Sequence, residues 1–417
     1  MRLPVGVFPL SAALLGLGLL TTVTSYAARQ ADEPDPSLAA ATLLPATPLA
    51  GTGYTIDSDV RTPGSYHVFT ITSAYGTFEA EGISQVATRL EEIAALGRID
   101  ELNKAGVFAR SAGESLIKVG SGVLHAVTEP VDTVKGIGGG VKRFGVNLGR
   151  RTKRAVRRMT DGKPDQGDDK SAGAKVGGAA ASAAKGLVGM NGARRRWAQR
   201  IGADPYTTNR VLKDALERVA AFDVAGGIAT GIAVPIPPLV GTTADVGNLV
   251  WGTDPEELRK LNEQRARDID ASRDGEYAFF RNQAYTLTMQ TRLIAALATV
   301  RLPGAGDYLE SAAEADSERE ALFFVESVEL LRREHEASPF ASMLTDSRAL
   351  VARRASGEVL LLLPLDWVRA SEAATAEFAE LARRASAELG ATSLRLRVTG
   401  TVTGPATTAL AAAGWRK

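Results

Sequence analysis

The chain has 417 residues and carries 49 lysines and arginines against 48 aspartates and glutamates, for a formal net charge of +1. It contains no cysteine, which excludes disulfides, thiolate catalysis and cysteine-based zinc sites, and is compatible with an oxidising compartment. The length suits two or three units of about 100–200 residues each. The near-neutral total conceals an uneven distribution of charge along the chain.

The first 27 residues are predicted to be a signal peptide. Arg2 supplies a positive start, residues 5–20 are apolar apart from one serine, and Ser25 and Ala27 fit a small-x-small cleavage site. An uncleaved anchor is the alternative, because residues 3–23 carry no charge and approach the length that spans a bilayer. Export places the protein in the periplasm or at the cell envelope.

Residues 28–53 are rich in proline, alanine and threonine and are interpreted as a disordered tether. Order is expected from Tyr54, in a unit over residues 54–160. Alternating residues predict short strands at 54–56, 66–71 and 76–80, with a turn at 62–65. Apolar residues spaced by threes and fours from Val86 to Leu96 then predict an amphipathic helix.

The most distinctive segment lies between Val127 and Met159, where apolar residues recur at spacings of three and four. Nine lysines and arginines between Lys135 and Arg158 flank this apolar stripe. Such a segment can lie in a lipid interface, where each cation near an anionic surface contributes about 1 kcal/mol. The residues expected to contact the membrane are Lys142, Arg143, Phe144, Leu148, Arg150, Arg151, Arg154, Arg157 and Arg158.

Two other interpretations of this basic segment stay open. The apolar stripe can pack on the protein's own core and leave a solvated basic face. The same cations can also bind nucleic acid, but an exported location and the lack of an aromatic reading face do not favour that partner. Numerous glycines weaken the helix in water, so it is expected to form on contact with anionic lipid or with another envelope protein.

Residues 161–190 have low complexity and are interpreted as a linker or a weakly formed alanine-rich helix. A helical domain is expected over residues 191–340. It opens with the basic cluster Arg194–Arg196, and either Thr208 or Asn209 caps its next helix. Residues 225–244 carry no charge and predict two short apolar helices joined by a proline turn. The alternative for this hairpin is insertion into a membrane by a toxin or pore former.

Asp254, followed by Pro255 and two glutamates, marks another helix start. Residues 341–417 change character: a hairpin, a helix around 373–389, a strand at 394–398 and a last helix predict a small ββαβα module. The fold class expected from these patterns is α+β and predominantly helical, with an N-terminal β-element, central helices and this C-terminal module.

No motif in the chain identifies a catalytic, metal or cofactor site. The three histidines, His67, His125 and His335, fall on different predicted elements, and no pair has the spacing of helical metal ligands. Neither a serine nucleophile elbow nor a phosphate-binding loop is present. No residue is therefore assigned a catalytic role. A hydrolase whose residues converge only in the fold is the enzymatic alternative.

Three stretches carry a resemblance: residues 73–79 (SAYGTFE), 129–136 (EPVDTVKG) and 204–209 (DPYTTN). With them the chain resembles a group of exported bacterial proteins without an assigned activity, across about residues 54–370. Residues 130–149 are similar in composition to the glycine-rich amphipathic segments of chorein-type lipid-transfer proteins. The first resemblance implies location, and the second implies contact with lipid.

The function expected from the sequence is that of an exported protein, peripherally associated with a membrane. It would serve as a structural or transport accessory of the envelope and contact anionic lipid through the basic segment.

Overall fold

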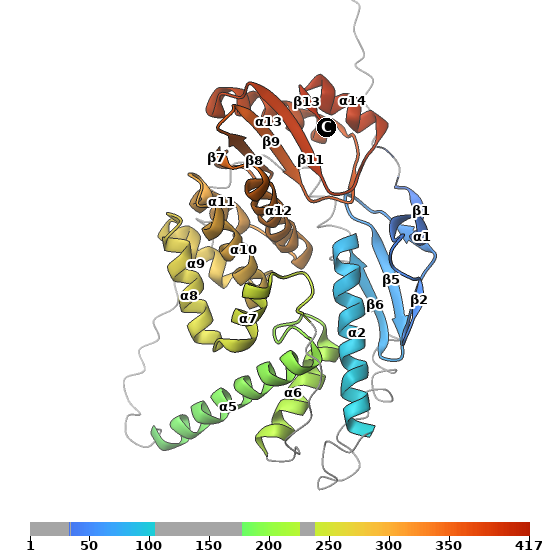
Figure 1. The fold of residues 1–417 in the computed structure, drawn as a ribbon, viewed down its shortest axis with the longest axis vertical. Coiled ribbons are helices and arrows are strands. Elements are labelled where there is room, and N and C mark those ends of the chain that lie inside the picture. The colour runs from blue at the N-terminus through green and yellow to red at the C-terminus, as the bar shows by residue number, and fades with distance from the viewer. Residues whose placement is uncertain (1–32, 34, 105–176, 226–237) are drawn as a thin grey trace, which may run out of the picture.

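The structure, a computed structural model, describes residue 33 and residues 35–104, 177–225 and 238–417 (Figure 1). Helices dominate these residues, while strands gather near the two ends of the chain (Figure 1). The predominantly helical α+β class predicted from the sequence is therefore confirmed. No helix among the described residues combines the length and the apolar composition needed to cross a membrane.

An antiparallel sheet forms the N-terminal part. Its strands are β1 (Ser37–Ala39), β2 (Ala50–Gly51), β3 (Tyr54–Ile56), β4 (Asp59–Arg61), β5 (Val68–Ser73) and β6 (Gly76–Glu81), with helix α1 (Ala40–Leu43) after β1. Strand β5 is central and pairs with β3, β4 and β6. The alternation predicted for β5 is present, because Phe69 and Ile71 are fully buried on one face of the sheet.

The start of this sheet corrects one sequence-based expectation. Residues 37–51 were expected to belong to a disordered tether, but they form β1, α1 and β2. Segments of two to four residues are too short to show a strand or helix period, and long-range pairing holds them: Leu38 faces Val60 across the β1–β4 pair. The side chain of Glu33 also accepts hydrogen bonds from the backbone N–H of Ala370 and the hydroxyl of Thr403, far away in the C-terminal part.

Helix α2 (Ile83–Lys104) packs along the sheet and links two hydrophobic clusters (Figure 1). Val86 and Ile93 join the sheet core, whereas Leu96 and Ile99 join a second cluster with the central helices. This confirms the amphipathic helix predicted around residues 86–96. Because one helix contributes to both clusters, the N-terminal sheet and the central helices are fixed to each other.

The central part is helical. Its helices are α5 (Gly177–Ile201), α6 (Arg210–Val224), α7 (Ala244–Gly252), α8 (Pro255–Arg267), α9 (Arg273–Arg281), α10 (Leu287–Val300), α11 (Ala305–Ala312) and α12 (Glu318–Ala337). The predicted caps are present: Asn209 caps α6 and Asp254 caps α8 through side-chain oxygens that accept backbone N–H groups. Residues 161–190 are expected to be either a linker or an alanine-rich helix. Residues 177–190 of this segment are helical and belong to α5.

The C-terminal part contains the predicted module in a larger form. Its elements are β7 (Phe340–Met343), β8 (Leu350–Arg354), β9 (Glu358–Leu363), β10 (Trp367–Val368), α13 (Glu372–Leu389), β11 (Ser393–Val398), β12 (Thr401–Val402), α14 (Gly404–Ala412) and β13 (Trp415–Arg416). The sheet order is β13-β11-β9-β8-β7, and β10 pairs with β12 beside it. Strands β8 and β9 form the predicted hairpin, and β9, β11 and β13 run parallel, connected through α13 and α14.

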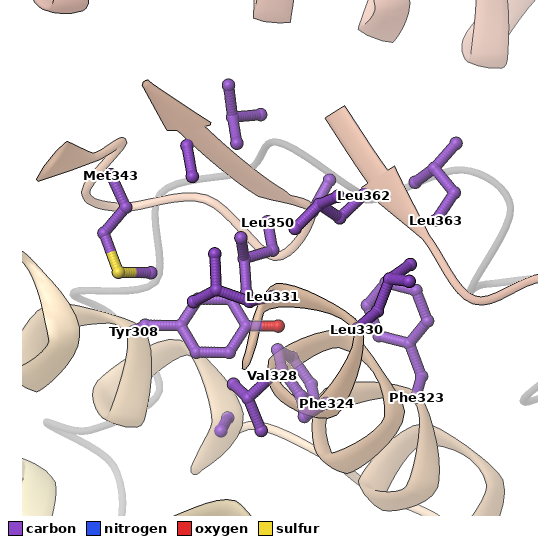
Figure 2. Close-up of a cluster of buried hydrophobic side chains, with 14 of the residues drawn as sticks. Tyr308, Phe323, Phe324, Val328, Leu330, Leu331, Met343, Leu350, Leu362 and Leu363 are labelled. Carbon is purple, nitrogen blue, oxygen red and sulfur yellow. The ribbon is translucent and has the colours of Figure 1, made fainter. Parts of the chain in front are cut away.

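One hydrophobic core joins the C-terminal sheet to the central helices (Figure 2). Phe324 and Leu331 of α12 are fully buried, and Leu350 and Leu362 of the sheet belong to the same cluster. The expected boundary at residues 340/341 therefore lies inside a shared core. Helix α12 and the C-terminal sheet are positioned together, and both contribute walls to the cavity described below.

Replacing Phe324 by alanine should lower the free energy of unfolding by about 3–5 kcal/mol. Its buried ring packs against the rings of Tyr308 and Phe323, so truncation to alanine would leave an empty space in the core. Val224→Ala is the control, because the Val224 side chain is half exposed at the end of α6; we expect a change of less than about 0.5 kcal/mol. Urea unfolding measures both, and equal costs would contradict this assignment of the core.

Candidate functional site

A cavity of about 550 Å³ lies where the N-terminal, central and C-terminal parts meet. Its walls come from the first turns of α2, the loops at 202–208 and 239–243, the start of α10, one face of α12, and Pro364, Asp366 and Thr399. This volume is typical of a small-molecule site. Among the described residues, the lining includes seven carboxyl side chains, four arginines and eight threonines, so most of the lining residues carry a charged or hydroxyl side chain.

Asp204 lies in the loop between α5 and α6 and lines the cavity. One of its oxygens, Oδ1, accepts hydrogen bonds from the hydroxyl of Thr288 at 2.7 Å and from the backbone N–H of Tyr206 at 2.8 Å. The other oxygen, Oδ2, makes no hydrogen bond to the described residues. Burial raises the pKa of Asp204 to about 6, against the lowering effect of these two hydrogen bonds.

Asp366 occupies a comparable position on the C-terminal side. Its Oδ2 accepts hydrogen bonds from the backbone N–H groups of His67 and Ile83, at 3.1 and 3.0 Å. Its Oδ1 has no hydrogen-bond partner in the part of the chain that the structure describes. The residue is only 8% exposed, and burial raises the pKa of its carboxyl to about 6. Asp366 thus presents a second carboxyl oxygen without a partner.

The backbone around Asp366 is held by close contacts. Gly400 packs so tightly that an added Cβ atom would lie 2.1 Å from the Asp366 carbonyl oxygen, which requires glycine at this position. Thr401 donates its backbone N–H to the same carbonyl oxygen at 2.8 Å, and the backbone N–H of Asp366 is bonded to the carbonyl of Ser65. The Asp366 side chain is therefore preorganised by β12 and by the turn before β5.

Glu92 of α2 is fully engaged. Its carboxylate accepts hydrogen bonds from the hydroxyl of Thr207 at 2.5 Å, from the amide of Asn209 at 3.0 Å and from Arg89 at 2.8 Å. Arg89 lies 3.8 Å from Glu318, at the start of α12. These bonds join α2, the 202–208 loop and α12 into one polar wall.

The face of α12 carries two further ion pairs. Glu329 accepts a bidentate pair from Arg292 of α10, at 2.8 and 2.9 Å. Glu326 accepts a hydrogen bond from Arg319 at 2.6 Å and another from the hydroxyl of Ser84 at 2.6 Å. Bidentate and charge-assisted bonds fix side-chain geometry as well as charge. These bonds fix the side chains of Arg292, Glu326 and Glu329 in the wall of the cavity.

The engaged and unengaged groups differ in kind. Arg89, Arg292 and Arg332 each pair with a glutamate, whereas Arg333 is exposed and has no ion-pair partner among the described residues. By contrast, Asp204 and Asp366 each keep one oxygen without a partner. The interior therefore offers hydrogen-bond acceptors to a ligand and keeps its guanidinium groups occupied.

The histidines do not form a catalytic centre in the described part of the chain. The ring of His67 lies 2.8 Å from the hydroxyl of Thr62, but both residues are buried outside the cavity, and burial lowers the pKa of His67 to about 4. Nδ1 of His335 accepts a hydrogen bond from the backbone N–H of Phe340 at the end of α12. His125 lies outside the described residues. The geometry required for a histidine-activated hydrolase is thus not met by His67 or His335.

The residues predicted to contact a membrane, from Lys142 to Arg158, all lie outside the described residues, as does most of the apolar stretch 225–244. Residues 238–243 of that stretch are described and form a loop that lines the cavity. The second basic cluster is structural: Arg194, Arg195 and Arg196 pair with Glu217, Asp254 and Asp223. Those three arginines stabilise the contacts of α5 within the fold.

Sequence reasoning assigned no role to the cavity residues. Asp204 belongs to one of the stretches that carry the resemblance, and Asp366 directly follows the run of buried leucines in β9. The one sequence feature that could have pointed to Asp366 as a site residue is an acidic side chain close to the end of a buried strand. The spatial relation between these two aspartates could not be derived from a separation of 162 residues.

Comparison with protein-family models, with characterised proteins and with solved structures found no match for this chain. Its function is therefore argued from the cavity and from the sequence alone.

Asp204→Asn should change how stability depends on pH. The folded pKa of about 6 lies above the ordinary value of 3.8, so the folded protein holds this proton to higher pH than the unfolded chain. The wild type therefore loses stability as the pH rises from about 4 through 6. The variant keeps an oxygen for Thr288 and Tyr206 but lacks the ionisable group. Relative to wild type, it should gain up to about 3 kcal/mol between pH 4 and pH 7.

Urea unfolding at the two pH values measures this difference. Asp214→Asn is the matched control, because Asp214 is exposed on α6 and the substitution makes the same change of charge. If the difference in free energy of unfolding between Asp204→Asn and the wild type does not vary with pH, the Asp204 carboxyl ionises in the folded protein without a cost from burial.

Proposed function

We propose that this protein is an exported binding protein that holds a small polar molecule in the cavity between α2, α10 and α12. The observation that carries the proposal is the convergence of three distant chain segments on a cavity of about 550 Å³ with ordered, charged walls. The export component rests on the predicted signal peptide at residues 1–27. The role that combines both features is a transport or sensing accessory of the cell envelope.

Preorganisation supports binding at this cavity. Its arginines are held by glutamates, and Asp366 is held by two backbone N–H groups and by a glycine contact. A site that is ordered before the ligand arrives loses less conformational entropy on binding. Burial of the Asp204 and Asp366 carboxyl groups without an ion-pair partner is destabilising in the absence of a ligand, and a bound ligand that pairs with them would offset this cost.

Filling the cavity should abolish binding. Thr88→Trp places a large ring on the α2 wall, and Ala87→Trp is its control, because Ala87 is exposed on the same helix and does not line the cavity. The mature protein would be screened by thermal shift against amines, amino acids, sugars, nucleosides and organic acids. A compound that stabilises the wild type should bind at least about tenfold more weakly to Thr88→Trp and equally to Ala87→Trp. Failure of every compound, or equal binding to all three proteins, would overturn the proposal.

Peripheral membrane association is a second candidate, favoured by the nine cations beside the apolar stripe of residues 127–159. It is compatible with the first, since a binding protein can be held at a membrane while it exchanges its ligand.

The full chain should co-sediment with vesicles containing anionic lipid at low salt and be released at high salt, because exposed charge attraction is screened. Glutamate substitutions at Arg150, Arg151 and Arg154 should weaken this binding at least tenfold. The same substitutions at the exposed residues Lys213, Arg259 and Lys260 should have little effect. Equal loss in both variants would indicate a general effect of net charge, and no sedimentation at low salt would remove the membrane candidate.

A further inference from the structure

We propose that the ligand of the cavity is a small organic cation bearing at least one ammonium group, which Asp204 and Asp366 bind. This inference rests on the proposed binding function and adds the chemical class of the ligand. It follows from a comparison of the charged side chains of the cavity that already form ion pairs with the two aspartates that do not.

The guanidinium charges of the interior wall are already paired with glutamates. Arg292 donates from Nε and Nη2 to Glu329, and Arg89 is shared between Glu92 and Glu318. An anionic ligand would compete with these glutamates for the guanidinium groups, and displacing one of them would leave a partly buried carboxylate without a partner. The exposed Arg333 can attract an anion only at the rim.

The acceptors, in contrast, are available. Oδ2 of Asp204 and Oδ1 of Asp366 have no partner among the described residues, although both side chains line the cavity. Asp366 is more than nine-tenths buried, so bulk water does not readily solvate its carboxyl. A ligand that donates hydrogen bonds to these two oxygens satisfies both carboxyl groups.

Charge favours an ammonium over a neutral hydroxyl. Five of the seven carboxyl groups of the described lining lie in ion pairs with arginines, whereas Asp204 and Asp366 have no ion-pair partner among the described residues. Coulomb attraction between opposite unit charges is several times stronger near a protein wall than in bulk water, so a cation is stabilised by the carboxylates of these two aspartates. Neutral polyols can bond to the threonine hydroxyls but do not neutralise their charge.

A metal ion is a poor alternative occupant. Within the described ranges, no group of three or more histidine, aspartate or glutamate side chains has the arrangement that could hold one. Hard cations such as Ca²⁺ take six to eight oxygen ligands, whereas Asp204 and Asp366 are the only two carboxyl groups of the described lining without an ion-pair partner. The volume of the cavity also far exceeds that of a bare ion.

The charged surroundings of the two aspartates predict a pH dependence. Asp204 is affected by Glu92 of α2, which raises its pKa, and by Arg292 of α10, which lowers it. The pKa of Asp366 is lowered by Arg319 and raised by Glu326, both of α12. Burial raises the pKa of both carboxyls to about 6. Because a cation prefers the ionised form, affinity should rise as the pH passes through 6 and level off above 7.

Calorimetric titration of the mature protein tests this proposal with three probes. These are butane-1,4-diamine, spermidine and butane-1,4-diol, the last being an uncharged isostere of the first. At pH 7.5 we expect both amines to bind at least tenfold more tightly than the diol. At pH 5 each amine should bind about tenfold more weakly than it does at pH 7.5. Asp204→Asn and Asp366→Asn should each reduce amine affinity at least tenfold and flatten its pH dependence, while Asp214→Asn should behave as wild type.

The outcomes separate this proposal from the one on which it rests. Equal affinity for diamine and diol, or amine binding that survives both aspartate substitutions, would overturn the assignment of an organic cation. If the screen instead finds a neutral or anionic compound whose binding Thr88→Trp abolishes, the cavity is a binding site and the cation assignment is wrong. Should Asp366→Asn fail to fold, Asp204→Asn and the pH profile decide the question.

Discussion

The carboxyl group of Asp366 joins the N-terminal and C-terminal parts of the molecule beside the cavity. Through two backbone hydrogen bonds it holds the start of β5, at His67, and the start of α2, at Ile83, against the segment that follows β9. Nearby, the hydroxyl of Tyr66 donates to the carbonyl of Pro364, and Arg319 of α12 lies 4.0 Å from the Tyr66 ring centroid. Were this junction absent, the N-terminal sheet and the C-terminal module would have fewer polar contacts to fix their relative position.

The same junction explains why charge accumulates at this site. A carboxyl that is 8% exposed must be stabilised by hydrogen bonds, and Asp366 receives them on one oxygen only. Asp204, which lines the same cavity, shows the same asymmetry. By contrast, Glu92, Glu326 and Glu329 in the same walls accept hydrogen bonds on both oxygens. Two aspartates without an ion-pair partner among the described residues, beside glutamates that are paired with arginines, are the feature of this cavity that a purely structural ion-pair network would not require.

Local patterns predicted much of the helical fold. Asn209 and Asp254 were identified as helix caps because a side-chain oxygen at that position accepts backbone N–H groups that have no partner within the helix. The β8–β9 hairpin was likewise visible from its alternating residues. Strands such as β1, β2 and β13 were missed, because they contain two or three residues and exist only through pairing with distant strands. The candidate site was not predicted, since its aspartates, arginines and glutamates carry no periodic signal.

Sequence alone determined the absence of cysteine chemistry, the helical character of the chain and the local start and end of its main helices, because these depend on composition and on neighbours within a few residues. The export signal and the membrane-contacting segment are sequence-based predictions on residues outside the described ranges. Only the tertiary structure decided which charges are paired. Arg194, Arg195 and Arg196 look like an available basic cluster in the sequence, yet each finds an acid 23–59 residues away, whereas Asp204 and Asp366 keep an oxygen unpaired. Pairing over such separations depends on how the elements pack, and no local pattern encodes it.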